Sequence, residues 1–260
     1  MGTAAVSPLR ILARTGRAEW TRLWTVKATW WFVAAAAVAM VGLGLVAGND
    51  AAHDVVPPVG EPAWVAPSIA ALPAQLALLA LALSAVTADY ASAGIVPTLQ
   101  WTPRRTTLFL ARVGVAVGTA SVVGILLAIA SGLAAHSMAA DILVLPLDEG
   151  VEVVGTTGIV FAAGCGLAAG LGFVLRSTAG ALISVFLLIL LLPLALPQFP
   201  YEWMLDLAAV LPGTGAVFLL TSEQVAEGMT RTSAIVTMLV WAGGALLLGW
   251  LRLVRDDANR

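Results

Sequence analysis

Residues 89–105 read DYASAGIVPTLQWTPRR, a polar stretch between two long apolar runs that we call the island. The apolar run before it ends near Val86, and the run after it extends from Thr107 to Ala135. Each run is long enough to cross the hydrocarbon core of a bilayer, which takes about 20 helical residues. The island is therefore predicted to be a loop that joins two transmembrane helices.

The composition of the whole chain agrees with this interpretation. Hydrophobic residues make up 60% of the 260 residues and charged residues only 11%, with a mean hydropathy of +0.96. Soluble domains carry about 25% charged residues. These values exclude a water-soluble globule and predict an integral membrane protein.

The apolar runs predict an all-α membrane protein with six transmembrane helices, over residues 30–48, 67–86, 107–135, 155–175, 180–197 and 234–251. They form one transmembrane domain, residues 30–252, which follows an N-terminal segment, residues 1–29, and precedes a polar tail, residues 253–260. In the second span, Gln75 could face the bundle interior. At the outer end of the fifth span, Pro193 and Pro197 are expected to break the helix.

The N-terminal segment mixes basic and apolar residues. Trp20, Leu23, Trp24 and Lys27 recur at the i, i+3, i+4, i+7 spacing of a helix. This pattern predicts a basic amphipathic helix that lies on the cytoplasmic membrane surface, with its tryptophans in the headgroup layer. A signal peptide is the alternative, although the charged region is unusually long for one.

The segment between the last two spans, residues 198–233, is mixed in character and too interrupted to cross a bilayer as one helix. Leu211, Pro212 and Gly213 break it before a short apolar run that ends at Leu220. We expect an outer-leaflet or re-entrant segment that is buried against protein, because irregular backbone is not tolerated against lipid.

The distribution of charge predicts the orientation. With both termini inside, 12 of the 13 basic residues lie on the cytoplasmic side, and only Arg231 lies outside. On the same assignment, 11 of the 15 acidic residues lie outside. This asymmetry predicts a multi-pass protein of the cell membrane with both termini in the cytoplasm.

Few polar residues interrupt the spans. An arginine at the bilayer midplane costs at least about 2.5 kcal/mol, so Arg112 is expected near the cytoplasmic edge with its side chain snorkelling to the interface, and a substrate contact is the alternative. Cys165 lies in a glycine-rich apolar run and is expected to be a small packed residue. His53 and His136 fall in different loops, and no metal site is expected.

The order of residues in the island resembles the cytoplasmic coupling segment of ABC-2 type transporter permeases. That segment has an acidic residue followed by Tyr, then Gly-Thr, then Thr-Pro-Arg-Arg before the next helix. Asp89-Tyr90, Gly94 and Thr102-Pro103-Arg104-Arg105 follow this order, with Asp in place of the commoner Glu and Ile95 in place of Thr. Permeases of this family are also similar in their interfacial N-terminal helix and their extracellular half-helices before the last span.

The resemblance implies the permease subunit of an ATP-driven ABC exporter for a lipid-like or amphipathic cargo, such as a drug, an antibiotic or a glycolipid. It implies a homodimer or heterodimer of permeases that docks two copies of a cytoplasmic ABC ATPase. The residues that the resemblance assigns to this docking, together with apolar neighbours, are Asp89, Tyr90, Gly94, Ile95, Leu99, Trp101, Thr102, Pro103, Arg104 and Arg105.

ATP and Mg²⁺ would be bound by that partner. The chain has no Gly-x-x-x-x-Gly-Lys-Ser/Thr motif, and its only lysine, Lys27, follows no glycine loop. No catalytic residue, cofactor or nucleic-acid partner is therefore expected in this chain, whose other partner is the lipid bilayer.

Other interpretations remain open at this point. An ion-coupled secondary carrier normally has an ionisable group in its membrane core, and the spans carry essentially no carboxylates. A non-transporting membrane scaffold is the third possibility, and an intramembrane enzyme lacks candidate catalytic groups. The end of the island also has a local explanation, since Thr102 is a plausible N-cap and Pro103 a good first helical residue.

Overall fold

The computed structural model describes residues 7–91, 94, 104–223 and 228–255, and all regular structure within them is helical. Six helical segments in this part of the chain are long and apolar enough to cross a membrane. They are α2 (Lys27–His53), α3 (Val65–Ala91), α5 (Arg105–Met138), α6 (Leu147–Leu175), a composite segment Thr178–Gln198 and α11 (Arg231–Arg255). The chain is thus a multi-pass membrane protein, as predicted.

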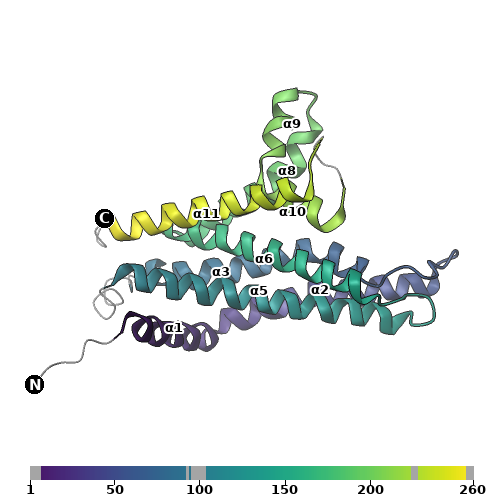
Figure 1. The fold of residues 1–260 in the computed structure, drawn as a ribbon, viewed down its shortest axis with the longest axis horizontal. Helices are drawn as coiled ribbons and strands as arrows, with labels where there is room; N and C mark the ends of the chain where they lie inside the picture. The colour runs from purple at the N-terminus through teal and green to yellow at the C-terminus, as the bar shows by residue number, and fades with distance from the viewer. Residues whose placement is uncertain (1–6, 92–93, 95–103, 224–227, 256–260) are drawn as a thin grey trace, which may run out of the picture.

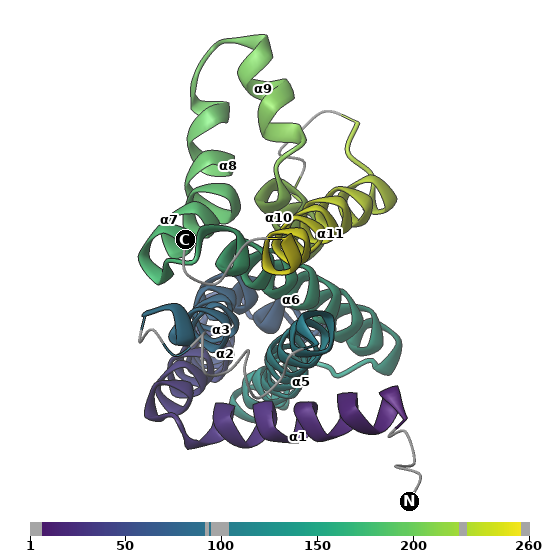
Figure 2. The ribbon, with the colours of Figure 1, turned by 90° about the vertical axis from the view of Figure 1, so that its left-hand side faces the viewer.

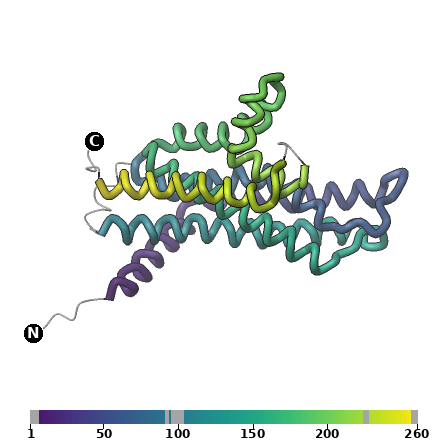
Figure 3. Tube along the Cα trace, turned by 45° about the horizontal axis from the view of Figure 1, so that its top comes forward, coloured from purple at the N-terminus to yellow at the C-terminus, as the bar shows by residue number. Residues whose placement is uncertain are grey.

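The spans form an elongated bundle whose two termini lie at the same end (Figures 1 and 3). We call this end the basic end, because Arg104, Arg105, Arg176 and Arg252 lie there, and the opposite end the acidic end. The helix α1 (Pro8–Thr25) lies across the basic end rather than along the spans (Figure 2). This placement is that of an interfacial helix.

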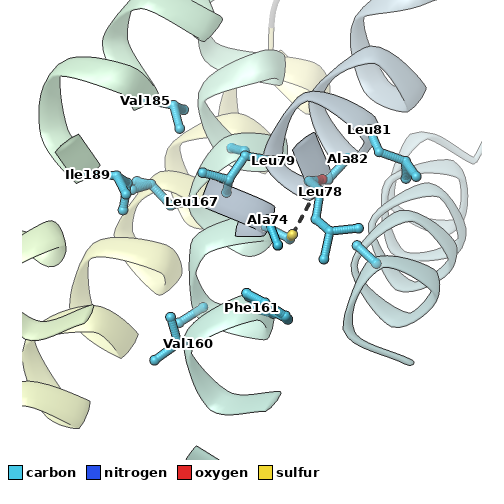
Figure 4. Close-up of a cluster of buried hydrophobic side chains, with 14 of the residues drawn as sticks. Ala74, Leu78, Leu79, Leu81, Ala82, Val160, Phe161, Leu167, Val185 and Ile189 are labelled. Atoms are coloured by element: carbon cyan, nitrogen blue, oxygen red, sulfur yellow. Dashed lines mark hydrogen bonds between the residues drawn. The ribbon is translucent and has the colours of Figure 1, made fainter. Parts of the chain in front are cut away.

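The centre of the bundle is formed by α3 and α6. Of their apolar segments, 56% and 72% of the residues are buried, against 28% or less for the other four spans. Side chains of α3 and α6 meet those of the composite segment in the main core (Figure 4). Cys165 is buried there, and its thiol donates to the carbonyl of Leu78 at 3.6 Å, as expected for a packed residue. Gln75 is also buried, and its amide donates to the carbonyl of Val160 at 3.3 Å.

The backbones of α6 and α11 approach each other closely. A Cβ atom on Gly170 would lie 2.6 Å from the backbone nitrogen of Leu246, and one on Gly249 would lie 2.9 Å from the carbonyl oxygen of Gly170. Small residues permit this approach, and in lipid the resulting van der Waals packing is a main source of helix association.

The composite segment corrects one expectation. It comprises α7 (Thr178–Phe186), a π-helical turn η1 (Leu187–Leu191), α8 (Leu192–Ala195) and a 3₁₀ turn η2 (Leu196–Gln198). Pro193 therefore does not break the helical run, whereas the run ends at Gln198, directly after Pro197. A proline ring clashes with the carbonyl four residues back in a regular α-helix, and the π-turn before Pro193 changes that geometry.

A bent helix pair precedes the last span, as predicted. α9 (Glu202–Ala209) and α10 (Pro212–Thr221) meet at 73°. Leu211, Pro212 and Gly213 at the bend are buried. The backbone of Gly213 lies directly against the carbonyl of Ile189 in the π-turn, so a side chain cannot be placed there without a shift. α9 and the end of the composite segment project from one side of the bundle (Figure 2).

Candidate functional site

The two ends of the island enter helices. Asp89 and Tyr90 belong to the last turn of α3, so they are helical rather than part of the loop in which they were expected. Gly94 lies in a turn beyond it, and α5 begins at Arg105, preceded by the exposed Arg104. The predicted docking residues Ile95, Leu99, Trp101, Thr102 and Pro103 lie outside the described residues.

Asp89 points into the bundle and joins a network of four charged side chains. Its Oδ2 accepts a hydrogen bond of 2.6 Å from Nη2 of Arg112 on α5, and its Oδ1 accepts one of 2.8 Å from Nη1 of Arg22 on α1. Glu19 on α1 completes the network. Its Oε1 lies 2.9 Å from Nη2 of Arg112, and its Oε2 lies 2.8 Å from Nη2 of Arg22.

The placement of Arg112 contradicts the expectation of snorkelling. The residue is only 1% exposed, and its Nη2 and Nε both donate to Glu19 while Nη2 also donates to Asp89. Ion pairs with two carboxylates thus offset the cost of desolvating the guanidinium, and the side chain does not need to reach water at the interface. Arg112 has no route to the headgroup layer because α1 covers it.

The network balances two arginines against two carboxylates and connects three helices. Arg22 also donates to the carbonyl of Ala85 in α3 at 2.5 Å. Because removal of one partner leaves a buried charge uncompensated, such a network holds its helices in one arrangement. The end of α3 that leads into the island is therefore tied to both α1 and α5.

Glu19 is the member that sequence reasoning missed. It is the only acidic residue in α1, among four arginines, and it lies four residues before the buried Leu23 on the same face of the helix. A lone carboxylate on the buried face of a basic helix was the available signal. Its partner could not be identified, because Arg112 lies 93 residues further along the chain.

An apolar cavity of about 180 Å³ adjoins the network. Leu23, Val26, Ala85 and Val115 are among its lining residues, together with Arg112. The Nη1 atom of Arg112 is buried and has no hydrogen-bond partner within the described residues. The two N–H groups of Nη1 therefore remain able to donate to a further acceptor.

A second set of arginines ties the ends of α5, α6 and α11 together. Arg105 donates to the carbonyl of Leu253 at 2.9 Å, and Arg252 donates to the carbonyl of Val174. Each guanidinium thus satisfies carbonyls that a helix C-terminus leaves unpaired. Nearby, the guanidinium of Arg176 lies 5.8 Å from the ring centre of Tyr90. Arg105 and Tyr90 therefore have packing roles in the bundle, whatever else they contact.

The predicted interfacial pattern is divided between two helices. Trp20, Leu23 and Trp24 lie on α1, whereas Lys27 is the first residue of α2, because the chain turns at Val26. Leu23 is buried, while Trp20 is 49% exposed. The ring centres of Trp20 and Trp24 are 5.7 Å apart.

At the acidic end, a cleft of about 300 Å³ lies between α6, α10 and α11. Arg231 pairs with Glu152 and donates to the hydroxyl of Thr156 at 2.7 Å. Both members of this pair are at least half exposed, so it contributes little to stability. Ser222 also lines the cleft, which therefore offers hydroxyls and a neutral ion pair to a polar group.

No protein-family model and no curated protein matches this chain. Within the described residues, no group of three or more His, Cys, Asp or Glu side chains could hold a metal ion. The network of Glu19, Arg22, Asp89 and Arg112 is the main concentration of buried charge that the structure describes. It lies at the point where the island joins the bundle, and we take it as the candidate functional site.

Proposed function

We propose that this chain is the membrane-spanning permease subunit of an ATP-driven exporter of the ABC-2 type. The observation that carries the proposal is the link between Asp89 and Arg112, because these residues clamp the helices that enter and leave the island. A soluble ATPase that moves the island then moves α3 and α5 as a unit. Coupling by contact requires such a rigid connection.

The orientation belongs to the same proposal. The basic end faces the cytoplasm according to the excess of positive charge there, so the island and α1 are presented to a cytoplasmic partner. Two ATPase copies bind ATP and Mg²⁺ and act on a pair of permease chains. The resemblance to ABC-2 permeases implies a lipid-like or amphipathic cargo, and the apolar membrane-facing surfaces of the bundle are compatible with it.

The network also favours a second candidate, an ion-coupled carrier. The predicted spans contain essentially no acidic residues. Glu19 and Asp89, which lie outside those predicted spans, nevertheless pair with the buried Arg112 and so provide ionisable groups within the bundle. They lie at the basic end rather than at the middle of the spans, where coupling-ion sites of secondary transporters usually lie. For this reason the ATP-driven mechanism is preferred.

Co-purification in mild detergent tests the proposal. An ATPase with a Walker motif should be recovered with the full-length chain, and substitution of Leu99 by Asp or Gly94 by Val should abolish its recovery or cargo export while leaving membrane abundance near normal. Arg104→Ala should weaken docking in a salt-sensitive way, because exposed charges are screened. It is a cleaner test than Arg105→Ala, since Arg105 also holds α11.

Three outcomes contradict the ATP-driven mechanism. They are export that requires a proton gradient in the absence of any ATPase, recovery of the chain without an ATPase under conditions that retain bound lipid, and full docking and export in every island variant. The first outcome selects the carrier, and the second leaves a membrane scaffold. The third shows that the island is an ordinary loop and removes the main support for the ABC-2 assignment.

A further inference from the structure

Three arginines on α1 form an exposed stripe. Arg10, Arg14 and Arg17 follow one another at i, i+4 and i+7, which places them on one face of the helix. All three are exposed, and their side chains have no partner within the described residues. We call these three residues the arginine stripe.

The stripe points away from the bundle. Glu19 and Leu23 are the buried residues of α1, and they pack towards α5. With 3.6 residues per turn, Glu19 lies on the opposite side of the helix from Arg17, two residues earlier. The stripe is therefore presented to whatever surrounds the basic end of the protein.

The charge of the stripe is uncompensated. The only carboxylate of α1 is Glu19, and its two oxygens are occupied by Arg112 and Arg22. The network is neutral in total, so it does not offset the three positive charges on the outer face. A partner for this face must therefore be anionic.

Tryptophans next to the stripe indicate which layer of the membrane it borders. Trp20 and Trp24 follow it on α1, and the ring centre of Trp24 lies 5.0 Å from that of Trp30 in the first turn of the transmembrane helix α2. Trp20 and Trp30 are 49% and 58% exposed. Exposed tryptophans beside the start of a span lie in the headgroup layer. The stripe therefore borders that layer.

We propose that the arginine stripe binds the phosphates of anionic membrane lipids and gives the protein a preference for a negatively charged bilayer. An acidic soluble protein would meet the same charge, but the adjoining tryptophans place this face beside lipid headgroups. A basic segment near the surface of an anionic membrane gains affinity with each arginine or lysine. The inference does not depend on the proposed transport function.

Electron spin resonance of labelled lipids tests the inference on the full-length protein. The purified chain is reconstituted into phosphatidylcholine bilayers with trace spin-labelled phosphatidylglycerol or phosphatidylcholine, and the motionally restricted fraction of each label is measured. The wild-type chain should prefer phosphatidylglycerol several-fold, and about 1 M salt should reduce the preference, since the Debye length is then about 3 Å. Changing all three arginines to glutamine should lower the preference at least twofold.

Matched variants separate charge from structure. Replacement of the three arginines by lysine keeps the charge and should keep the preference, and Arg255→Gln, which removes an exposed charge from the basic end outside α1, should leave it nearly unchanged. If the triple glutamine variant is poorly folded, the single change Arg14→Gln should still lower the preference measurably.

The inference is overturned if the wild-type chain shows no preference, or if the glutamine variants retain it in full. It is also overturned if the lysine variant loses the preference as the glutamine variant does, because the effect then does not follow charge. If the triple glutamine variant loses a co-purifying ATPase but keeps the lipid preference of the wild-type chain, the stripe binds a soluble partner instead.

Discussion

Arg112, in the second turn of α5, donates a hydrogen bond of 2.6 Å to Asp89, the first residue of the island, which lies in the last turn of α3. The contact closes a loop of the chain that contains the island. A movement of the island relative to the bundle is therefore transmitted to both helices or has to break a buried ion pair.

The first prediction concerns the stability of this ion pair. Arg112→Met should lower the free energy of unfolding by about 3–5 kcal/mol, because Glu19 and Asp89 both lose the buried guanidinium with which they pair. Arg17→Met removes an exposed arginine whose side chain has no partner in the described part of the chain, and it should change stability by less than about 0.5 kcal/mol. Thermal unfolding in detergent measures both, and equal effects would contradict the network.

The second prediction is that Glu19 and Arg112 are energetically coupled. Glu19→Gln and Arg112→Gln should each destabilise the protein, and the double variant should be less destabilised than the sum of the two, with an interaction energy of about 0.5–3 kcal/mol. As a comparison, Arg17→Gln combined with Arg112→Gln should be additive. Additivity in the first pair would show that the carboxylate and the guanidinium act independently.

The third prediction concerns the bend before the last span. Gly213→Ala should destabilise the protein by about 1–3 kcal/mol, because the new methyl group meets the carbonyl of Ile189 and the ring of Pro193. Gly243→Ala provides the control, since nothing lies within 4 Å of its Cβ position on the exposed side of α11. A neutral Gly213→Ala variant would mean that the bent pair does not pack on the π-turn.

The fourth prediction concerns the contact between α6 and α11. Gly170→Ala should separate the two helices and lower the unfolding temperature, because its methyl group overlaps the backbone between Ala245 and Leu246. Gly118→Ala, on the open face of α5, should have no such effect. Cross-linking of cysteines placed at Gly166 and Ala242, whose Cβ atoms would lie 3.5 Å apart, would report the separation directly. Unchanged cross-linking in Gly170→Ala would contradict the close packing.

The fifth prediction concerns orientation. In a Cys165→Ala background, Val59→Cys at the acidic end should react with an impermeant maleimide added to intact cells, because Val59 is 76% exposed. Ser7→Cys, which is exposed at the basic end, should react only after the cells are opened. Neither change alters the charge on which the orientation depends. The reverse labelling pattern would place the basic end outside.

Much of the architecture follows from the sequence because it depends on local properties. A run of about 20 apolar residues is stable in lipid as a transmembrane helix, so the number of spans and their approximate positions could be predicted. The interruption at Leu211, Pro212 and Gly213 likewise predicted the broken segment, because proline and glycine act on their own backbone. Pro193 was misjudged, since a π-turn in the preceding residues accommodates its ring.

The candidate site depends on the tertiary structure. Arg112 could be identified as costly in a membrane, but whether it reaches water or meets a carboxylate is decided by what packs over it. α1 lies across the basic end and brings Glu19 to Arg112 from 93 residues away, while the extension of α3 by one turn turns Asp89 inwards. Hydropathy and spacing describe a residue's own helix, whereas the pairing of buried charges requires the relative placement of three helices.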